Sequence, residues 1–275
     1  MWWPPFLYPP PASALVAGIS AVQFVALAKL GLGELRGENM AYSKFWQVMA
    51  GKQQKSGGGG GAVLPSRSGM LVAYVPALVA AVASFAVPGA VEGVRAQLLS
   101  AAISGHFLKR VLEVMFIHQY SGSMALDGAL TISICYVLMT TGMIYAQHLT
   151  SGLPDPPLDL LYPGVLVFAV GVAGNFYHHR LLSQLRTTKQ GGGGGDKAYK
   201  IPTGGLFGLV TCPHYLFEIV GFFGFAMIAQ TVHALAVAAG TAAYLAGRSC
   251  ATRRWYESKF EDFPENIKAL VPYVL

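Results

Sequence analysis

YKIPTGGLFGLVTCPHYLFE, residues Tyr199–Glu218, is the most informative stretch of this chain. A loop punctuated by proline and glycine leads into an apolar run that we expect to enter a membrane. That run nevertheless contains His214, Tyr215 and Glu218. Imidazole and carboxylate groups are costly at bilayer depth, so they usually face a protein-lined cavity and mark function. His214 and Glu218 are four residues apart and share one helix face, which indicates either a functional site or a buried pair that joins two helices.

The composition is that of a membrane protein. The chain has 275 residues, of which 53% are hydrophobic and 12% charged, whereas soluble domains carry roughly 25% charged residues. The net charge of +6 comes from basic residues dispersed among apolar segments, so flanks of membrane helices explain it better than a nucleic-acid partner. Cys135, Cys212 and Cys250 lie far apart without zinc-site spacing, so we predict neither disulfides nor a metal site.

The hydropathy pattern predicts an all-α polytopic membrane protein with seven transmembrane helices in one bundle. A membrane-spanning helix needs about 20 mainly apolar residues. The segments that satisfy this rule are 12–32, 70–91, 96–117, 129–149, 160–182, 206–229 and 232–249. Only a short turn separates the last two segments, so six spans are the alternative.

We expect one structural domain with two regions. Residues 1–100 hold the N-terminal helices and a glycine-rich cytosolic loop, and residues 101–275 hold the C-terminal region in which the polar groups gather. The glycine runs at 57–61 and 191–195 lack the strand and helix of a phosphate-binding loop, so they indicate flexible linkers. Lysine and arginine concentrate on one side of the predicted spans, while Arg95 is the single basic residue opposite. The positive-inside rule therefore predicts a lumenal N-terminus and a cytosolic C-terminus.

The third predicted span carries four ionisable residues on one face. His106, Lys109, Arg110 and Glu113 are spaced i, i+3, i+4 and i+7. Such a stripe cannot face lipid, so it must line a cavity or pair with other helices. The structural alternative is a ladder of ion pairs near the cytosolic end, in which Lys109 and Arg110 snorkel to the interface.

The end of the fifth predicted span adds a second polar face. Asn175 and His179 are four residues apart and share it, whereas His178 and Arg180 are interpreted as a basic cytosolic flank. The basic and aromatic residues expected at the same cytosolic mouth are Tyr177, Arg186, Tyr199, Lys200, Arg254 and Tyr256. This mouth suits a planar ligand rich in phosphate, such as a nicotinamide dinucleotide, another nucleotide or an anionic lipid headgroup.

The residue set favours hydride transfer over hydrolysis. No serine or cysteine nucleophile with a neighbouring base is apparent in the sequence. Hydride transfer requires the protein only to bind a cofactor, polarise a carbonyl and deliver a proton. Tyrosine, lysine, histidine and glutamate around a dry cavity suffice for those tasks.

The C-terminal part of the chain resembles the steroid 5α-reductase family, which includes the trans-2-enoyl-CoA reductases of very-long-chain fatty acid elongation. The resemblance covers roughly residues 100–275. It rests on Asn175, LLSQLR (181–186), YKIPTGGLF (199–207), CPHYLFE (212–218), RWYESKFEDFP (254–264) and KALVPYVL (268–275). It implies a seven-helix fold in the endoplasmic reticulum that binds NADPH on its cytosolic half and reduces a C=C bond conjugated to a carbonyl.

The resemblance also implies which residues contact NADPH. The residues that it assigns by position are Asn175, Arg186, Tyr199, His214, Glu218 and Tyr256. Lys200, at the basic cytosolic mouth, is predicted to contact the same cofactor. His118 and His179 stand where steroid reductases have Asn and Asp, and His214 stands where the family usually has Asn. The histidine at position 214 adds a titratable group to the expected cofactor site.

On the substrate side the chain combines features of two branches. Steroid reductases hold the ketone with a glutamate and a tyrosine, whose places are taken here by Tyr74 and Phe107. HFLKRVLEVMFIHQYS (106–121) resembles the enoyl-CoA reductase branch and favours an acyl thioester, whereas the tail and the IPTGGLF loop resemble the steroid branch. We predict that Tyr74 or Tyr215 donates to the carbonyl and that Lys109 and Glu113 orient the donor.

The resulting prediction is an NADPH-dependent reductase of an α,β-unsaturated carbonyl lipid, either trans-2-enoyl-CoA or a 4-ene-3-ketosteroid. Partners in a lipid-elongation complex fit the first substrate. Two alternatives remain open at this point. One is a membrane methyltransferase that uses S-adenosylmethionine and shares this helical architecture, and the other is a non-catalytic lipid-binding homologue.

Overall fold

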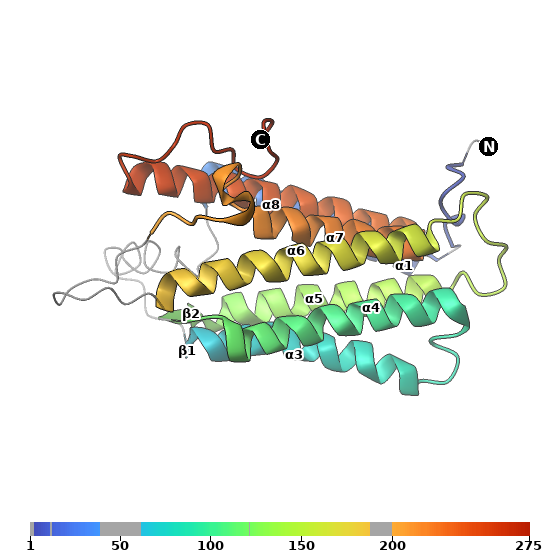
Figure 1. Cartoon of the computed structure of the whole chain (residues 1–275). Helices are drawn as coiled ribbons and strands as arrows, with labels where there is room; N and C mark the ends of the chain where they lie inside the picture. The colour runs from blue at the N-terminus through green and yellow to red at the C-terminus, as the bar shows by residue number, and fades with distance from the viewer. Residues whose placement is uncertain (1–2, 12, 39–61, 121, 188–199) are drawn as a thin grey trace.

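Helices that lie side by side make up almost all of this computed structural model (Figure 1). It describes residues 3–11, 13–38, 62–120, 122–187 and 200–275, with the side chains of 186 and 187 excepted. Seven helices lie within these residues. They are α1 (Ala14–Arg36), α3 (Ser66–Ala83), α4 (Gly93–Leu112), α5 (Leu126–His148), α6 (Leu161–Thr187), α7 (Pro213–Ala229) and α8 (Val232–Lys259). The two glycine runs, which were predicted to be flexible linkers, lie outside the described residues.

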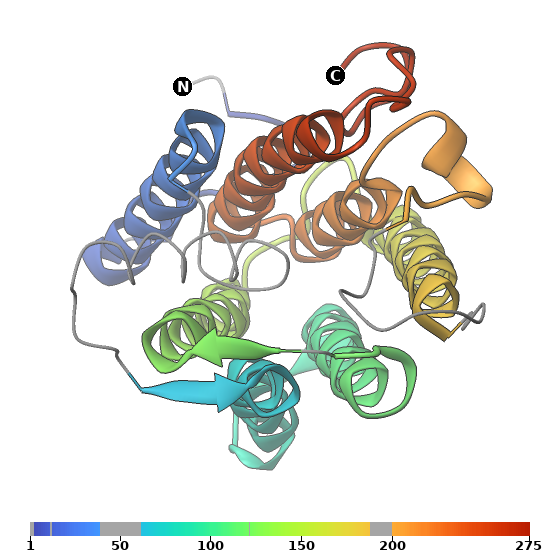
Figure 2. The same ribbon diagram turned by 90° about the vertical axis from the view of Figure 1, so that its left-hand side faces the viewer.

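The helices form two layers, which are seen end-on in Figure 2. One layer follows the order α1, α8, α7, α6, and the other contains α5, α3 and α4. A short antiparallel ribbon, β1 (Val63–Pro65) with β2 (Ser123–Ala125), joins the beginnings of α3 and α5. The sequence does not predict this ribbon, because each strand has only three residues.

The helical membrane architecture is confirmed, although the spans are less uniform than predicted. Three helices are individually long and apolar enough to cross a membrane: α1, α3 with its extension to Ala86, and α5. Their outward side chains are strongly exposed, as at Val22 (68%) and Ile134 (58%), which is the pattern of helices that face lipid. The chain is therefore a multi-pass membrane protein. The helix α7 is apolar but shorter, and α4, α6 and α8 carry polar residues.

The predicted span 206–229 is wrong in its first turns. Gly204 and Gly205 have φ values of 84° and 52°, a left-handed conformation that interrupts a helix. A single 3₁₀ turn, η3 (Gly205–Gly208), follows, and α7 begins only at Pro213, its first residue. Cys212 and the residue before it instead bond the tail, with a distance of 3.1 Å from the Cys212 nitrogen to the Ala269 oxygen.

Glycines let neighbouring helices of one layer approach closely. A Cβ added at Gly171 of α6 would lie 2.4 Å from the Gly221 nitrogen of α7, and one at Gly247 of α8 would lie 2.1 Å from the Gly31 oxygen of α1. Backbone atoms at these distances cannot give way without moving a helix. Small residues at these crossings are the usual means of close packing between membrane helices.

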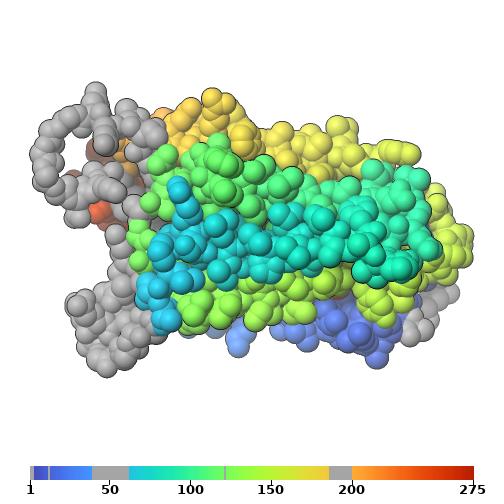
Figure 3. Space-filling view, turned by 90° about the horizontal axis from the view of Figure 1, so that it is seen from below, coloured from blue at the N-terminus to red at the C-terminus, as the bar shows by residue number. Residues whose placement is uncertain are grey.

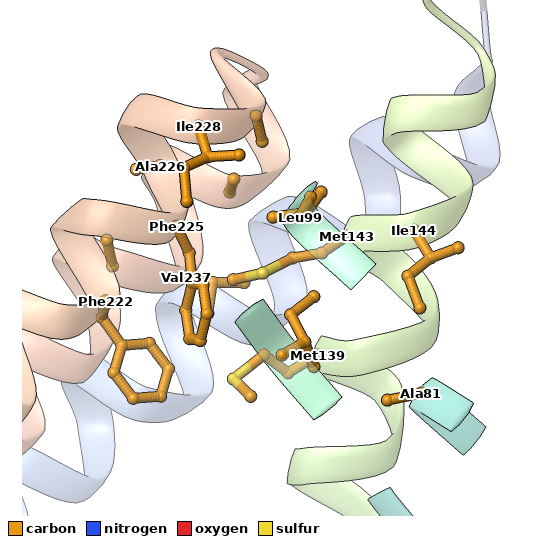
Figure 4. Close-up of a cluster of buried hydrophobic side chains, with 14 of the residues drawn as sticks. Ala81, Leu99, Met139, Met143, Ile144, Phe222, Phe225, Ala226, Ile228 and Val237 are labelled. Atoms are coloured by element: carbon orange, nitrogen blue, oxygen red, sulfur yellow. The ribbon is translucent and has the colours of Figure 1, made fainter. Parts of the chain in front are cut away.

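The middle of the bundle is filled by apolar side chains (Figure 4). Phe222 and Phe225 of α7 meet Met139 and Met143 of α5, and none of the four is more than 4% exposed. Leu99 of α4 completes the contact between the layers. Because the middle of the bundle is packed with apolar side chains, clusters of buried polar side chains are found toward its ends.

Candidate functional site

Hydrogen bonds between side chains connect α4 with α3 and α6, and one to the backbone connects α6 with α7. The end of α4 and the beginning of α7 lie at the end of the bundle that carries the β-ribbon, on the left in Figure 1. We call this set of side chains the polar cluster. Its members are Tyr74, Lys109, Arg110, Glu113, His118, Asn175, His179, His214 and Glu218. All but Arg110 were predicted as site residues from the sequence.

Glu113 is the centre of the polar cluster. Its side chain is 1% exposed, and its Oε1 lies 3.2 Å from Lys109 Nζ. Its Oε2 accepts a hydrogen bond from Arg110 Nη1 at 3.0 Å and lies 3.1 Å from His179 Nδ1. Glu113 also begins a π-helical turn, η2 (Glu113–Ile117), at the end of α4. Such turns are rare and frequently occur at functional sites.

Arg110 connects three helices. One guanidinium nitrogen contacts Glu113 and lies 3.1 Å from His179 Nδ1 on α6, and the other donates a hydrogen bond to the hydroxyl of Tyr74 on α3. Arg110 is 8% exposed, so the expectation that it snorkels to the interface is wrong. The ion pairs predicted as a structural alternative are present along α4. Arg110 also contacts His179 of α6 and Tyr74 of α3, so the interactions are not confined to one helix.

Asn175 continues the network from α6 to α7. Its Oδ1 accepts a hydrogen bond from Lys109, and its Nδ2 donates to the backbone oxygen of His214 at 2.8 Å. Nδ2 also lies 3.5 Å from Oε2 of Glu218. His214 and Glu218 were predicted to share a helix face. Both contact the Asn175 amide, His214 through its backbone oxygen and Glu218 through its carboxylate.

The histidines gather beside Glu113. The His179 ring lies 4.8 Å from that of His118 and 5.5 Å from that of His214. The ring of Tyr215, the other predicted donor, lies 4.2 Å from that of His214. Three titratable rings in one place would not be expected in a purely structural core.

Glu113, His118 and His179 have the composition of a metal site. Their ligand atoms all lie within 4.8 Å of one another. The Arg110 guanidinium, however, already lies within hydrogen-bond distance of both Glu113 and His179, and Lys109 is beside the same carboxylate. A divalent ion at this point would meet two cations, so the geometry favours a hydrogen-bonded set around arginine.

Two residues assigned from spacing have a different role in the structure. His106, although on the predicted stripe, is buried among the rings of Phe107, Phe222 and Phe225 at 5.1 to 5.8 Å. His178 is not a basic flank, because it is only 2% exposed. Its Nδ1 donates to the Gly174 oxygen at 2.7 Å and its Nε2 accepts from the Leu206 nitrogen at 3.1 Å. It therefore fastens the η3 turn to α6.

Other predicted site residues lie away from the polar cluster or outside the description. The Tyr256 ring stacks on those of Phe260 and Phe263 in the tail, at 5.9 and 5.7 Å. Lys200 is exposed in the loop before η3. Tyr199 lies outside the described residues, as does the side chain of Arg186.

One ring next to the site was missed. Tyr136 of α5 lies 5.5 Å from the Tyr74 ring and 5.2 Å from the Phe107 ring. The available signal was a tyrosine in the middle of an apolar span. Spacing along α5 alone does not show which neighbouring helix this tyrosine meets.

Comparison with known proteins places this arrangement in a family. Residues 123–275 match the family model of 3-oxo-5-alpha-steroid 4-dehydrogenase. The chain is 42% identical over 112 residues to steroid 5-alpha-reductase DET2 of Gossypium hirsutum, a match that covers 40% of this chain and 41% of that relative. It is 30% identical over 174 residues to a very-long-chain enoyl-CoA reductase of Dictyostelium discoideum, covering 62% and 55%.

A third relative is 3-oxo-5-alpha-steroid 4-dehydrogenase 1 of Rattus norvegicus, which is 29% identical over 191 residues, with 64% of this chain and 71% of that relative covered. The matched regions thus span about half the length of the first two relatives. The family-model match contains α6 and α7 with Asn175, His179 and Glu218, whereas Tyr74, Lys109 and Glu113 precede it. Because this match extends over more than half of the chain, the protein belongs to the 3-oxo-5-alpha-steroid 4-dehydrogenase family.

Proposed function

We propose that this protein is an NADPH-dependent reductase of the C=C bond of an α,β-unsaturated carbonyl lipid. The observation that carries the proposal is the chain of hydrogen bonds and one ion pair that runs from Tyr74 through Arg110 and Glu113 to Lys109 and Asn175. It joins the α6 and α7 residues of the family-model region to a phenol from α3. Family membership and relatives named as steroid and enoyl-CoA reductases support the reaction class.

The polar cluster has the donors and acceptors that a nicotinamide carboxamide needs. A carboxamide both donates and accepts hydrogen bonds. The carboxylate of Glu218 can accept one and the Asn175 amide can donate one, on the side formed by α6 and α7. His118, His179, His214 and the exposed Lys200 are proposed to contact the same cofactor, together with Arg186, Tyr199 and Tyr256. When bound, NADPH supplies the hydride.

Tyr74 is our proposed donor to the substrate carbonyl. Hydride addition at the β carbon moves negative charge onto the carbonyl oxygen, and a positioned donor stabilises that charge. Arg110 donates a hydrogen bond to the Tyr74 hydroxyl and stacks on its ring at 4.7 Å, so the phenol is already oriented. The guanidinium charge also offsets negative charge that reaches the phenol oxygen when it donates to the carbonyl. A proton then reaches the α carbon and completes the saturated product. Tyr215 is the second candidate donor.

We favour an acyl thioester over a steroid as the substrate. Phe107, which stands where steroid reductases have a tyrosine, is fully buried and packs against Tyr136, so no hydroxyl is present at that place. The Lys109–Glu113 pair belongs to the stretch that resembles enoyl-CoA reductases.

We further propose that all seven helices cross the endoplasmic reticulum membrane with the polar cluster toward the cytosol. The helices α4, α6, α7 and α8 lie alongside the three that meet the criteria for a span (Figure 1). Among the described residues, Arg36 ends α1, Arg67 lies in the first turn of α3 and Lys259 ends α8. These helix ends are on the side that carries the polar cluster, on the left in Figure 1, which is the cytosolic side under the positive-inside rule.

The test is a substrate and cofactor comparison on purified protein. Binding of NADPH and of S-adenosylmethionine is measured by calorimetry, and NADPH oxidation is then followed with trans-2-hexadecenoyl-CoA and with a 4-ene-3-ketosteroid. We expect binding of NADPH and turnover of the thioester. Tighter binding of S-adenosylmethionine would favour the methyltransferase alternative, and NADPH binding without turnover of either substrate would favour a non-catalytic homologue.

A further inference from the structure

A groove with a volume of about 400 Å³ lies on the side of the bundle between α4 and α6. These two helices are neighbours on the face shown in Figure 3, where α4 separates α3 from α6. Neither the predicted cofactor contacts nor the predicted carbonyl donors account for this groove. It adjoins the polar cluster, because Lys109 and Glu113 belong to both.

The groove is almost wholly apolar, and two nearly buried charged side chains lie at its base. Leu108 and Leu112 of α4 are 48% and 44% exposed, and Phe176 of α6 is 39% exposed. Lys109 and Glu113, whose charged atoms are 3.2 Å apart, also line it. A surface of this kind fits a molecule with a hydrocarbon chain and a polar group at one end.

The π-helical turn shapes the groove. In η2 the His118 nitrogen bonds the Glu113 oxygen at 2.8 Å, five residues back, so the helix is wider here than in an α-turn. Glu113 points inward and is 1% exposed, while Phe116 in the same turn lines the groove and is 70% exposed. The turn thus places an apolar ring at the rim and a carboxylate at the floor.

We propose that this groove receives the hydrocarbon chain of a linear acyl thioester, which enters from the bilayer between α4 and α6. The inference rests on the proposed function and adds the path of the chain to it. The thioester group would lie at the inner end of the groove, where Lys109 and Glu113 belong to the same polar cluster as the proposed donor Tyr74. On its α5 side the Tyr74 ring packs against Tyr136, which also packs against Phe107, so a lateral groove has more room for a long chain than the core.

Gly105 provides a direct test. It is an exposed groove residue on α4, and a Cβ built on it would meet no atom within 4 Å. Gly105→Phe therefore fills the groove without a clash, and it replaces a poor helix former. The matched control is Gly18→Phe on α1, where the glycine is also exposed and a Cβ again meets nothing within 4 Å. Gly18 does not line the groove.

The two variants are compared on substrates that share the reacting group and differ in chain length. For trans-2-hexadecenoyl-CoA, Gly105→Phe is expected to lower kcat/KM about tenfold or more, because burial of several methylenes is lost. For trans-2-butenoyl-CoA, kcat/KM should stay within about twofold. Gly18→Phe should change neither value. Equal effects of Gly105→Phe on both substrates, or no effect on either, would overturn the groove assignment and leave the reductase proposal intact.

A binding measurement separates the groove from the reaction. A sixteen-carbon acyl-CoA with a photoreactive diazirine at the chain end is cross-linked to the wild type in detergent, and the labelled peptides are identified by mass spectrometry. Labelling of α4 between Gly105 and Phe116, or of α6 near Phe176, supports the groove even if no thioester is reduced, in which case the proposed function fails alone. Labelling confined to other helices would refute the assignment of the acyl chain to this groove. The assignment also fails if excess phosphatidylcholine, added as a competitor, abolishes all labelling.

Discussion

Arg110 of α4 donates a hydrogen bond to the Tyr74 hydroxyl of α3, and its guanidinium carbon lies 4.7 Å from the centre of the Tyr74 ring. The arginine therefore holds both the polar and the aromatic part of this tyrosine. The same guanidinium contacts Glu113, which is bound to Lys109. A phenol on one helix is thus oriented by charges on another, and several consequences can be measured.

Tyr74→Phe removes the proposed donor but keeps the ring on which Arg110 stacks. We expect kcat with trans-2-hexadecenoyl-CoA to fall about 100-fold, the usual effect of losing one positioned donor to a developing oxyanion. The Kd for NADPH should be unchanged. Steady-state kinetics and calorimetry measure the two quantities.

The control for this prediction is Tyr162→Phe, because Tyr162 is 69% exposed at the other end of α6. If kcat of Tyr74→Phe stays within about twofold of the wild type while Tyr215→Phe loses activity, Tyr215 is the donor instead.

Glu113→Gln removes the one buried carboxylate shared by Lys109, Arg110 and His179. Breaking a buried ion pair at one partner costs about 3–5 kcal/mol, because the remaining charge is left uncompensated. We expect a lower Tm in detergent and a loss of turnover. In the same background, Lys109→Met should recover part of the lost Tm, since it removes one of the uncompensated charges.

Glu257→Gln serves as the matched control, because Glu257 is half-exposed and its partner Arg253 is also accessible to solvent. An exposed pair of this kind contributes about 0–1 kcal/mol. Equal losses of Tm in Glu113→Gln and Glu257→Gln would contradict the central role of Glu113.

Asn175→Ala should weaken NADPH binding. The variant removes a proposed donor to the cofactor and also the acceptor that holds Lys109. Loss of one charge-assisted hydrogen bond is expected to raise the Kd for NADPH about tenfold. Asn266→Ala, at an exposed position of the tail, is the control. An unchanged Kd in correctly folded Asn175→Ala would remove Asn175 from the cofactor site.

Gly171→Ala tests the close approach of α6 and α7. The new methyl carbon would lie 2.4 Å from the Gly221 nitrogen, so one helix must move, at a cost of about 1–3 kcal/mol. Gly128→Ala on α5 is the counterpart, since nothing lies within 4 Å of its Cβ, and it should be neutral or stabilising by about 1 kcal/mol. Thermal unfolding in detergent compares the variants, and equal Tm values would refute the packing argument.

Asp159 should contribute a pH-dependent part of the stability at the opposite end of the bundle. The backbone N–H of Leu161 and the Arg95 guanidinium, at 2.9 and 2.7 Å, hold the pKa of its carboxyl below the usual value. A depressed pKa means that the unfolded chain binds the proton first. The contribution is therefore present above about pH 4, the ordinary value, and is lost as the pH falls through the folded pKa.

Unfolding measured from pH 7 downward should show this loss in the wild type and a smaller one in Asp159→Asn. Asp262→Asn, in the exposed tail, should follow the wild type. Identical acid profiles for the wild type and Asp159→Asn would disprove the contribution of the Arg95 contact.

The positions of most helices could be predicted from the sequence because hydropathy is a local property. The expected spans 12–32 and 129–149 lie close to α1 and α5, and the turn before 232 does separate α7 from α8. Residues 206–212 were assigned to a helix because they are apolar. Two left-handed glycines and hydrogen bonds to the distant tail decide otherwise, and hydropathy does not report backbone conformation.

By itself the sequence determined that this is a helical membrane protein with ionisable residues on α4, α6 and α7, since composition and i, i+4 spacing need no tertiary information. Spacing placed His106 and Glu113 on the same stripe, yet the structure puts the first among phenylalanines and the second among cations. Only the tertiary structure decided which polar residues meet. That choice depends on how each helix is rotated against its neighbours, and close glycine contacts and buried hydrogen bonds between distant segments set this rotation.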